Sequence, residues 1–129
     1  MKRLRQTGLW TSSIFLAFVF VAVGLSKLEG SSATRWAQRF LSWGYPAGSQ
    51  YAVGAIEIIA GIAMVIPPLR KVAAGIVMVI MAGALYTHVR HGEFLRVLPP
   101  IFLGGLALIV FSLHSQPSES SKGDRAMSG

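Results

Sequence analysis

Residues 51–70 read YAVGAIEIIAGIAMVIPPLR, an apolar stretch with a single carboxylate, Glu57, in its middle. An α-helix turns by about 100° per residue, which divides this stretch into a side of small residues and a side of branched residues. Because small residues let a second helix approach closely, we expect Glu57 to face neighbouring helices and the branched side to face lipid. Glu57 shares its side with Gly54, Ala60, Gly61 and Met64, whereas Ile59, Ile62 and Ile66 lie opposite.

The composition of the chain is typical of a membrane protein. Of its 129 residues, 53% are hydrophobic and 13% are charged, whereas soluble domains carry about 25% charged residues. Residues 6–26, 72–89 and 97–118 contain no lysine, arginine, aspartate or glutamate. A membrane-spanning helix needs about 20 predominantly apolar residues, so these three runs and residues 51–70 provide four spans. The sequence therefore predicts an all-α fold, a bundle of four transmembrane helices.

Proline and glycine mark the expected ends of the spans. Residues 67–71 are expected to end the second span in a tight basic turn, Gly92 to end the third helix, and Leu98-Pro99-Pro100 to open the last one. Residues 1–115 are expected to form one four-helix membrane domain. Residues 116–129 are rich in serine, glycine and charge, and we expect them to be a disordered polar tail. The chain has no cysteine, which excludes thiol–disulfide exchange and cysteine-ligated cofactors.

The net charge and its distribution bear on partners and orientation. A net charge of +7 would suggest a nucleic-acid partner for a soluble protein, but these basic residues flank apolar runs, so we expect anionic lipid headgroups and no nucleic acid. The basic start and the apolar run over residues 9–25 resemble a signal peptide, but the run is long for one, and we expect a retained helix. Seven of the twelve lysines and arginines then share the side of both termini. This count predicts a multi-pass membrane protein with both termini cytoplasmic. The membrane that we expect it to occupy is a bacterial inner membrane.

The longest connection, residues 29–50, contains four aromatic residues, Trp36, Phe40, Trp43 and Tyr45. The first three recur at helical spacing on one face, ahead of the turn that contains Tyr45. An aromatic face of this kind suits a short helix that lies in the headgroup region. We therefore expect an interfacial helix between the first and second spans, with these four residues as interfacial anchors. A ligand-binding role for the same face is the alternative.

Polar groups from three helices converge on one half of the predicted bundle. Lys27 closes the first helix, Glu57 lies in the second, and Thr87 and His88 close the third. A buried carboxylate needs a cation or hydrogen-bond donors, so Lys27 or His88 is the predicted partner of Glu57. These four residues are our candidates for a polar pocket.

Two interpretations of this convergence stay open. The contact either fixes the register of the helices or forms a pocket that binds a small ligand or relays a proton. No metal-ligand spacing, phosphate-binding glycine loop or nucleophile motif is present, so we name no metal ligand and no catalytic residue.

Several short motifs occur in the order and spacing of a known family. They are Gly24-x-x-Lys27-Leu28, Trp43-Gly44-Tyr45-Pro46, Gly54-x-x-Glu57-x-x-x-Gly61, Pro67 with Arg70, Met81-x-Gly83-Ala84-x-x-Thr87-His88 and Gly92-Glu93. Together they resemble the DoxX-like family of small four-helix membrane proteins, over about residues 9–110. The resemblance implies the same helical membrane fold that the apolar runs predict.

The resemblance also carries expectations about function. Some relatives are associated with membrane-linked sulfur or quinone redox systems and with oxidative-stress complexes, and similar vertebrate proteins act in receptor assembly. It therefore implies an auxiliary subunit of a membrane redox or quinone-linked system, not catalytic on its own, with a polar pocket around Glu57. A membrane assembly or chaperone-like protein and a small proton-coupled carrier are the alternatives. A bound quinone, a membrane or redox protein partner and a homo-oligomer all remain open.

Overall fold

The computed structural model describes residues 2–115 of the chain. This part folds into five α-helices and one short 3-10 helix and contains no strand, which confirms the all-helical prediction. The expected polar tail, residues 116–129, lies outside the described residues. In chain order the elements are α1 (Lys2–Leu28), α2 (Gly30–Ser42), α3 (Ser49–Met64), α4 (Pro67–Arg90), η1 (Phe94–Val97) and α5 (Leu98–Ser115).

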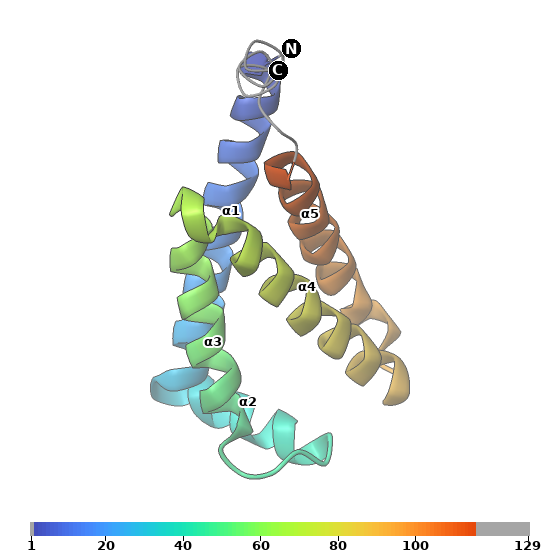
Figure 1. Cartoon of the computed structure of the whole chain (residues 1–129). Coiled ribbons are helices and arrows are strands. Elements are labelled where there is room, and N and C mark those ends of the chain that lie inside the picture. The colour runs from blue at the N-terminus through green and yellow to red at the C-terminus, as the bar shows by residue number, and fades with distance from the viewer. Residues whose placement is uncertain (1, 116–129) are drawn as a thin grey trace.

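The helices are arranged as two antiparallel pairs. α3 runs beside α1, and α5 runs beside α4, while α2 lies across the end of the structure where α1 finishes (Figure 1). The two pairs meet near the junction of α3 and α4 and diverge toward α2 (Figure 1). The arrangement is therefore more open than the four-helix bundle that the sequence predicted.

Three segments of the described chain are long and apolar enough to cross a membrane: Lys2–Leu28, Pro67–Arg90 and Phe94–His114. α3 is also apolar, but it has only 16 residues. Most of the large apolar side chains on the outer faces of these helices are exposed. Such an outer surface suits the hydrocarbon of a bilayer, where apolar side chains need no covering from water.

The boundary between the second and third spans differs from the prediction. We expected one helix over residues 51–70, ended by a basic turn at residues 67–71, but α3 ends at Met64 and α4 begins at Pro67. Two prolines fit the first turn of a helix because its N–H groups have no partner within the helix. Arg70 therefore belongs to the first turn of α4, and the predicted turn is wrong at this point.

Other helix ends are where the sequence predicts them. α2 is followed by Gly44, with φ +89°, and α4 is followed by Gly92, with φ +72°. Glycine adopts these left-handed conformations without the steric cost that a side chain adds. The last helix opens with Leu98 ahead of two prolines, again as expected.

The buried side of α3 is the side that the helical periodicity predicts. Its buried residues are Gln50, Gly54, Glu57, Ala60, Gly61 and Met64, and Ile59, Ile62 and Ile66 are exposed. Below this side lies an apolar core to which α1, α3, α4 and α5 all contribute. It comprises Leu9, Leu16, Phe20, Ala60, Met64, Ala73, Ala74, Val77, Ala107 and Val110. This core holds the two helix pairs together on the side of the structure away from α2.

Candidate functional site

The site begins with a backbone contact between α1 and α3. A Cβ atom added to Gly24 would lie 2.6 Å from the carbonyl oxygen of Gly54, and one added to Gly54 would lie 2.9 Å from that of Gly24. Only glycine permits two helices to approach this closely. Lys27 lies one helical turn after Gly24, and Glu57 lies one turn after Gly54. Because α1 and α3 are antiparallel, these two steps lead in opposite directions along the helix pair, and a Cβ atom added to Gly54 would lie 3.0 Å from Lys27 Cβ. The side chains of Lys27 and Glu57 reach back toward each other to meet beside the glycine contact.

Lys27 and Glu57 form a buried ion pair. The Lys27 ammonium group donates a hydrogen bond to Glu57 Oε1, and the two side chains are 7% and 2% exposed. Each charge offsets the cost of burying the other, whereas either one alone would be strongly destabilising. The second oxygen, Glu57 Oε2, is buried as well and has no hydrogen-bond partner among the described residues.

The indole of Trp36 covers the ammonium group of this pair. Lys27 Nζ lies 4.5 Å from the centroid of the Trp36 ring, at the distance of a cation–π contact. Trp36 Nε1 donates to Ser26 Oγ over 3.1 Å, and this hydrogen bond fixes the ring above Lys27. The Arg39 guanidinium carbon lies 5.1 Å from the same ring. α2 therefore supplies an aromatic cover for the charged groups of α1 and α3.

The segment after α2 is tied to the end of α4 by a contact between two hydroxyl groups. Tyr45 Oη lies 2.5 Å from Thr87 Oγ1. The Thr87 hydroxyl donates to the carbonyl oxygen of Gly83 over 2.8 Å, so in this arrangement it accepts a hydrogen bond from the Tyr45 hydroxyl. Thr87 is buried and Tyr45 is partly exposed.

A second connection joins the same two regions through Glu93. Trp43 Nε1 donates to Glu93 Oε1 over 2.8 Å, and His88 Nδ1 lies 3.3 Å from the same oxygen. Arg96 donates to Glu93 Oε2 over 2.6 Å. The His88 ring also meets the Trp43 ring edge-on, with centroids 5.5 Å apart. We call Tyr45, Thr87, Trp43, His88 and Glu93 the α2–α4 latch.

The surroundings of Glu93 favour its charged form. Burial alone would raise the pKa of this carboxyl group, but three partners outweigh it. The hydrogen bonds of Trp43 and His88 and the positive charge of Arg96 hold the pKa of Glu93 below its ordinary value. Hydrogen bonds and a nearby cation both stabilise a carboxylate over the neutral acid.

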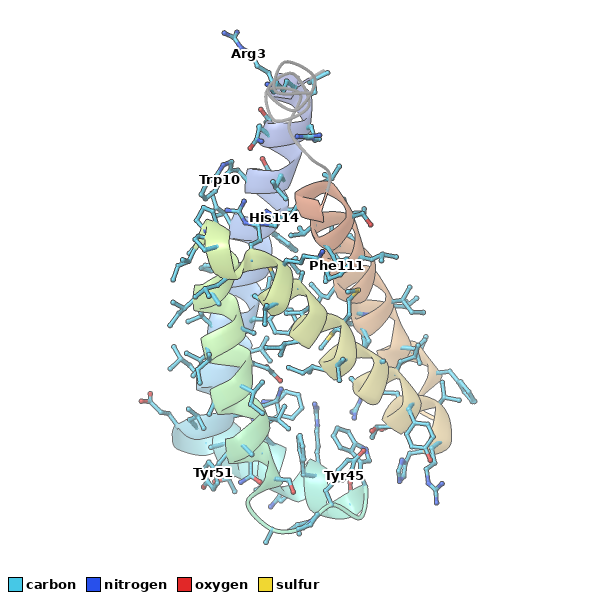
Figure 2. The ribbon with its side chains drawn as sticks, viewed as in Figure 1. Arg3, Trp10, Tyr45, Tyr51, Phe111 and His114 are labelled. Carbon is cyan, nitrogen blue, oxygen red and sulfur yellow. The ribbon has the colours of Figure 1, made fainter. Side chains whose placement is uncertain are left out.

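A cavity of about 670 Å³ lies between the two helix pairs, beneath α2. Most of its wall is apolar. Its polar groups belong to the ion pair, to the arginines Arg39 and Arg96, and to Trp36, Trp43, Tyr45, Ser49, Thr87 and His88. Figure 2 shows Tyr45 at this end of the molecule and Trp10 and His114 at the opposite end. Small-molecule sites combine apolar walls with a few placed polar groups in this way. Its apolar wall includes Val19, Phe20, Val23, Phe40, Val53, Ile56, Ile80, Met81, Ala84 and Leu103.

The structure brings all four candidate pocket residues to this one cavity: Lys27, Glu57, Thr87 and His88. It selects Lys27 as the partner of Glu57. His88, the other predicted partner, instead contacts Glu93, because α4 has diverged from α3 at that level. The four aromatic residues expected as interfacial anchors, Trp36, Phe40, Trp43 and Tyr45, also line the cavity.

Two ionisable residues with well-defined contacts were not among our candidates. Glu93 is one of them, and the only signal was its position just after Gly92 at the end of a helix. The other is Arg70, which is 2% exposed at the end of the structure away from α2. Arg70 Nε donates to the carbonyl oxygen of Met64 over 2.9 Å, and its guanidinium carbon lies 4.2 Å from the Trp10 ring. Its position two residues after a pair of prolines was a signal that we assigned to a turn.

These observations define a helical membrane protein with an ion pair buried inside a largely apolar cavity. Comparison with known proteins places it further: the chain belongs to the DoxX-like family, whose model matches residues 11–110. No curated protein and no solved structure matches the chain. Family membership and the apolar helices together make it a multi-pass membrane protein whose outer surface contacts the lipid bilayer.

Proposed function

We propose that this protein binds a lipid-soluble small molecule of the quinone type in the cavity beside Lys27 and Glu57. It would serve a membrane redox system as an auxiliary subunit and would not catalyse a reaction on its own. The observation that carries the proposal is the cavity itself, a space of about 670 Å³ that is apolar except for a few buried polar groups. Its size falls within the range of small-molecule sites, about 300–1,000 Å³.

The residues around the cavity fit the two parts of such a ligand. A Lys27 N–H is suited to donate to a ligand oxygen, because the side chain of Lys27 lines the cavity and an ammonium group carries three donors. Phe40 and Trp43 offer ring faces for a planar head group, and Val53 and Ile80 offer apolar surface for a tail. When bound, a quinone supplies the electron-accepting chemistry, and this chain supplies binding and orientation.

The proposal includes a topology in which α1, α3, α4 and α5 all cross the membrane as one domain ending at residue 115. α3 would be the shortest span, at about 24 Å for 16 residues, which a locally thinned bilayer accommodates. The first turn of α1 and the last turn of α5 lie at the same end of the structure (Figure 1). Lys2, Arg3, Arg70 and Lys71 lie toward that end as well, which supports a cytoplasmic location for it in a bacterial inner membrane.

In the same topology α2 lies in the outer headgroup region. Its exposed side carries Arg35 and Gln38, and its aromatic side faces the cavity. A helix with this distribution suits an interfacial position. The aromatic residues of α2 would then be both the membrane anchor and the cover of the ligand.

The direct test is to purify the protein in lipid nanodiscs and identify the lipophilic compounds that it retains by mass spectrometry. Ala84→Trp places a large side chain at a residue that lines the cavity, and Ala82→Trp places the same side chain at an exposed residue of α4. We expect a compound of the quinone type, as quinone or hydroquinone, to be retained by the wild type and by Ala82→Trp and to be lost from Ala84→Trp. Equal amounts in all three proteins, or none in any, would contradict the proposal.

A further inference from the structure

We propose that the ligand of this cavity is an aromatic hydroxyl compound, a phenol or hydroquinone, and that Lys27 and Glu57 together recognise its O–H group. This inference rests on the proposed function of the cavity and deepens it by naming the chemical group that the ion pair binds. Lys27 and Glu57 are the specificity-determining residues in this account.

The first observation is the unused oxygen of Glu57. Oε1 accepts the hydrogen bond of Lys27, whereas Oε2 is buried without a donor in the part of the chain that the structure describes. Leaving a buried carboxylate oxygen without a donor is unfavourable, because it has lost its hydrogen bonds to water. Glu57 lines the cavity, so a ligand donor there is placed to satisfy this oxygen.

The second observation is the remaining donor capacity of Lys27. Its ammonium group has three N–H donors; one is directed to Glu57 Oε1, and the ring face of Trp36 lies 4.5 Å from Nζ. At least one N–H is left for an acceptor on the ligand. The ion pair therefore presents one donor and one acceptor side by side.

A hydroxyl group matches this combination because its oxygen accepts one hydrogen bond while its hydrogen donates another. A carbonyl or ether oxygen can only accept, and would leave Glu57 Oε2 without a donor. A phosphate or carboxylate would bring a second negative charge against Oε2, which is unfavourable in a medium of low dielectric constant. The ion pair thus discriminates against anions and, for a ligand of the quinone type, favours the hydroquinone form over the quinone form.

The walls near the ion pair favour a hydroxyl on an aromatic ring. The rings of Phe40 and Trp43 have centroids 5.3 Å apart, and Tyr45 lies 5.7 Å from Phe40. Such a cluster stacks well with another flat ring. Few polar groups line the cavity beyond those already described, so a sugar with several hydroxyl groups would lack partners.

The test compares a long-chain phenol with its methyl ether. Binding of para-decylphenol and of para-decylanisole is measured by isothermal titration of the protein in lipid nanodiscs, with empty nanodiscs to correct for partitioning into lipid. We expect the phenol to bind at least about ten-fold more tightly, since the ether cannot donate to Glu57 Oε2. Equal affinities for the two compounds would overturn the inference and leave the proposed function intact. Binding of neither compound by a thermally stable protein would overturn both.

A pair of matched variants links the preference to Glu57. Glu57→Gln can place N–H donors where Oε2 accepts, so the ratio of the two affinities should fall to about one or reverse. Glu29→Gln makes the same chemical change at an exposed residue and should leave the ratio as in the wild type. A Glu57→Gln protein that keeps the wild-type preference would contradict the inference. If Glu57→Gln does not fold, the ratio of the phenol and ether affinities of the wild type decides the inference.

Discussion

Gly24 and Gly54 face each other so closely that the carbonyl oxygen of each occupies the place where the other would carry a side chain. This backbone contact fixes α1 against α3. Because the two helices are antiparallel, Lys27 and Glu57 lie one turn to either side of the contact, and their side chains reach back toward each other to form the ion pair. The position of the ion pair, and with it the cavity, depends on two residues that carry no functional group of their own.

The first prediction concerns this contact. Gly24→Ala would bring a methyl group to 2.6 Å from backbone oxygen of α3, so α1 and α3 must move apart at a cost of about 1–3 kcal/mol. Gly105→Ala is the control, because nothing lies within 4 Å of a Cβ added there. Thermal unfolding in mild detergent should show a lower midpoint for Gly24→Ala alone. Similar midpoints for both variants would show that the helices do not rely on the glycine contact.

The second prediction concerns the ion pair. Glu57→Leu leaves the Lys27 ammonium group buried alone, with an expected cost of about 3–5 kcal/mol, and Glu57→Lys should cost more because two cations then face each other. The double variant Lys27→Met with Glu57→Leu should recover much of the loss, since apolar groups of similar volume can replace a buried pair. Unfolding of the three proteins in detergent measures this. Equal losses for Glu57→Leu and Glu57→Lys would argue against the pairing of Lys27 with Glu57.

The third prediction concerns pH and Glu93. Because the pKa of Glu93 is lowered in the folded protein from its ordinary value of 4.5, its contacts stabilise the fold fully above that pH. This contribution should decline as the pH falls through the lowered pKa. Trp43 fluorescence should change over the same range as the indole loses its carboxylate acceptor. In Glu93→Gln this change in fluorescence with pH should be absent. A fluorescence transition that persists in Glu93→Gln would show that another group titrates and would contradict the prediction.

The fourth prediction concerns Arg70. Its guanidinium group donates a hydrogen bond to the carbonyl oxygen of Met64, at the end of α3, and stacks on Trp10 of α1. Arg70→Met should therefore lower the free energy of unfolding by about 1–3 kcal/mol. Arg70→Lys should recover only part of this loss, because an ammonium group lacks the planar fork. Arg35→Met, at an exposed residue of α2, is the control for loss of one positive charge. If Arg70→Met and Arg35→Met unfold alike, Arg70 does not hold these helices together.

Much of the site could be predicted from the sequence because its residues recur at helical spacing on the faces of α1 and α3. Gly24 and Lys27 share a helix face, as do Gly54 and Glu57, so periodicity alone places the two charges at a helix contact. The choice between Lys27 and His88 could not be made, because it depends on how far α4 diverges from α3. The aromatic residues of α2 were assigned to one face correctly, but a pattern of spacing does not say whether that face meets lipid or a cavity.

The features that the sequence predicted wrongly or not at all also depend on how the helices pack. Two prolines can follow the end of one helix or open the next. The sequence alone therefore could not decide whether residues 67–71 form a turn or the start of α4. Glu93 owes its contacts to the conformation of the chain around Gly92, which brings its carboxylate to Trp43, a residue 50 positions earlier. Contacts of that separation are set by the packing of helices and leave no periodic trace in the sequence.

The central claim, that the cavity beside Lys27 and Glu57 holds a lipid-soluble ligand, is tested most directly by photolabelling. The protein in nanodiscs is irradiated with a diazirine analogue of para-decylphenol, with and without an excess of the unmodified phenol, and labelled residues are identified by mass spectrometry. We predict labelling of cavity residues such as Val53, Ile80 and Met81, and its loss when the unmodified phenol competes. Labelling confined to the exposed residues Ile59, Ile62 and Val79, or labelling that excess phenol does not reduce, would contradict the claim.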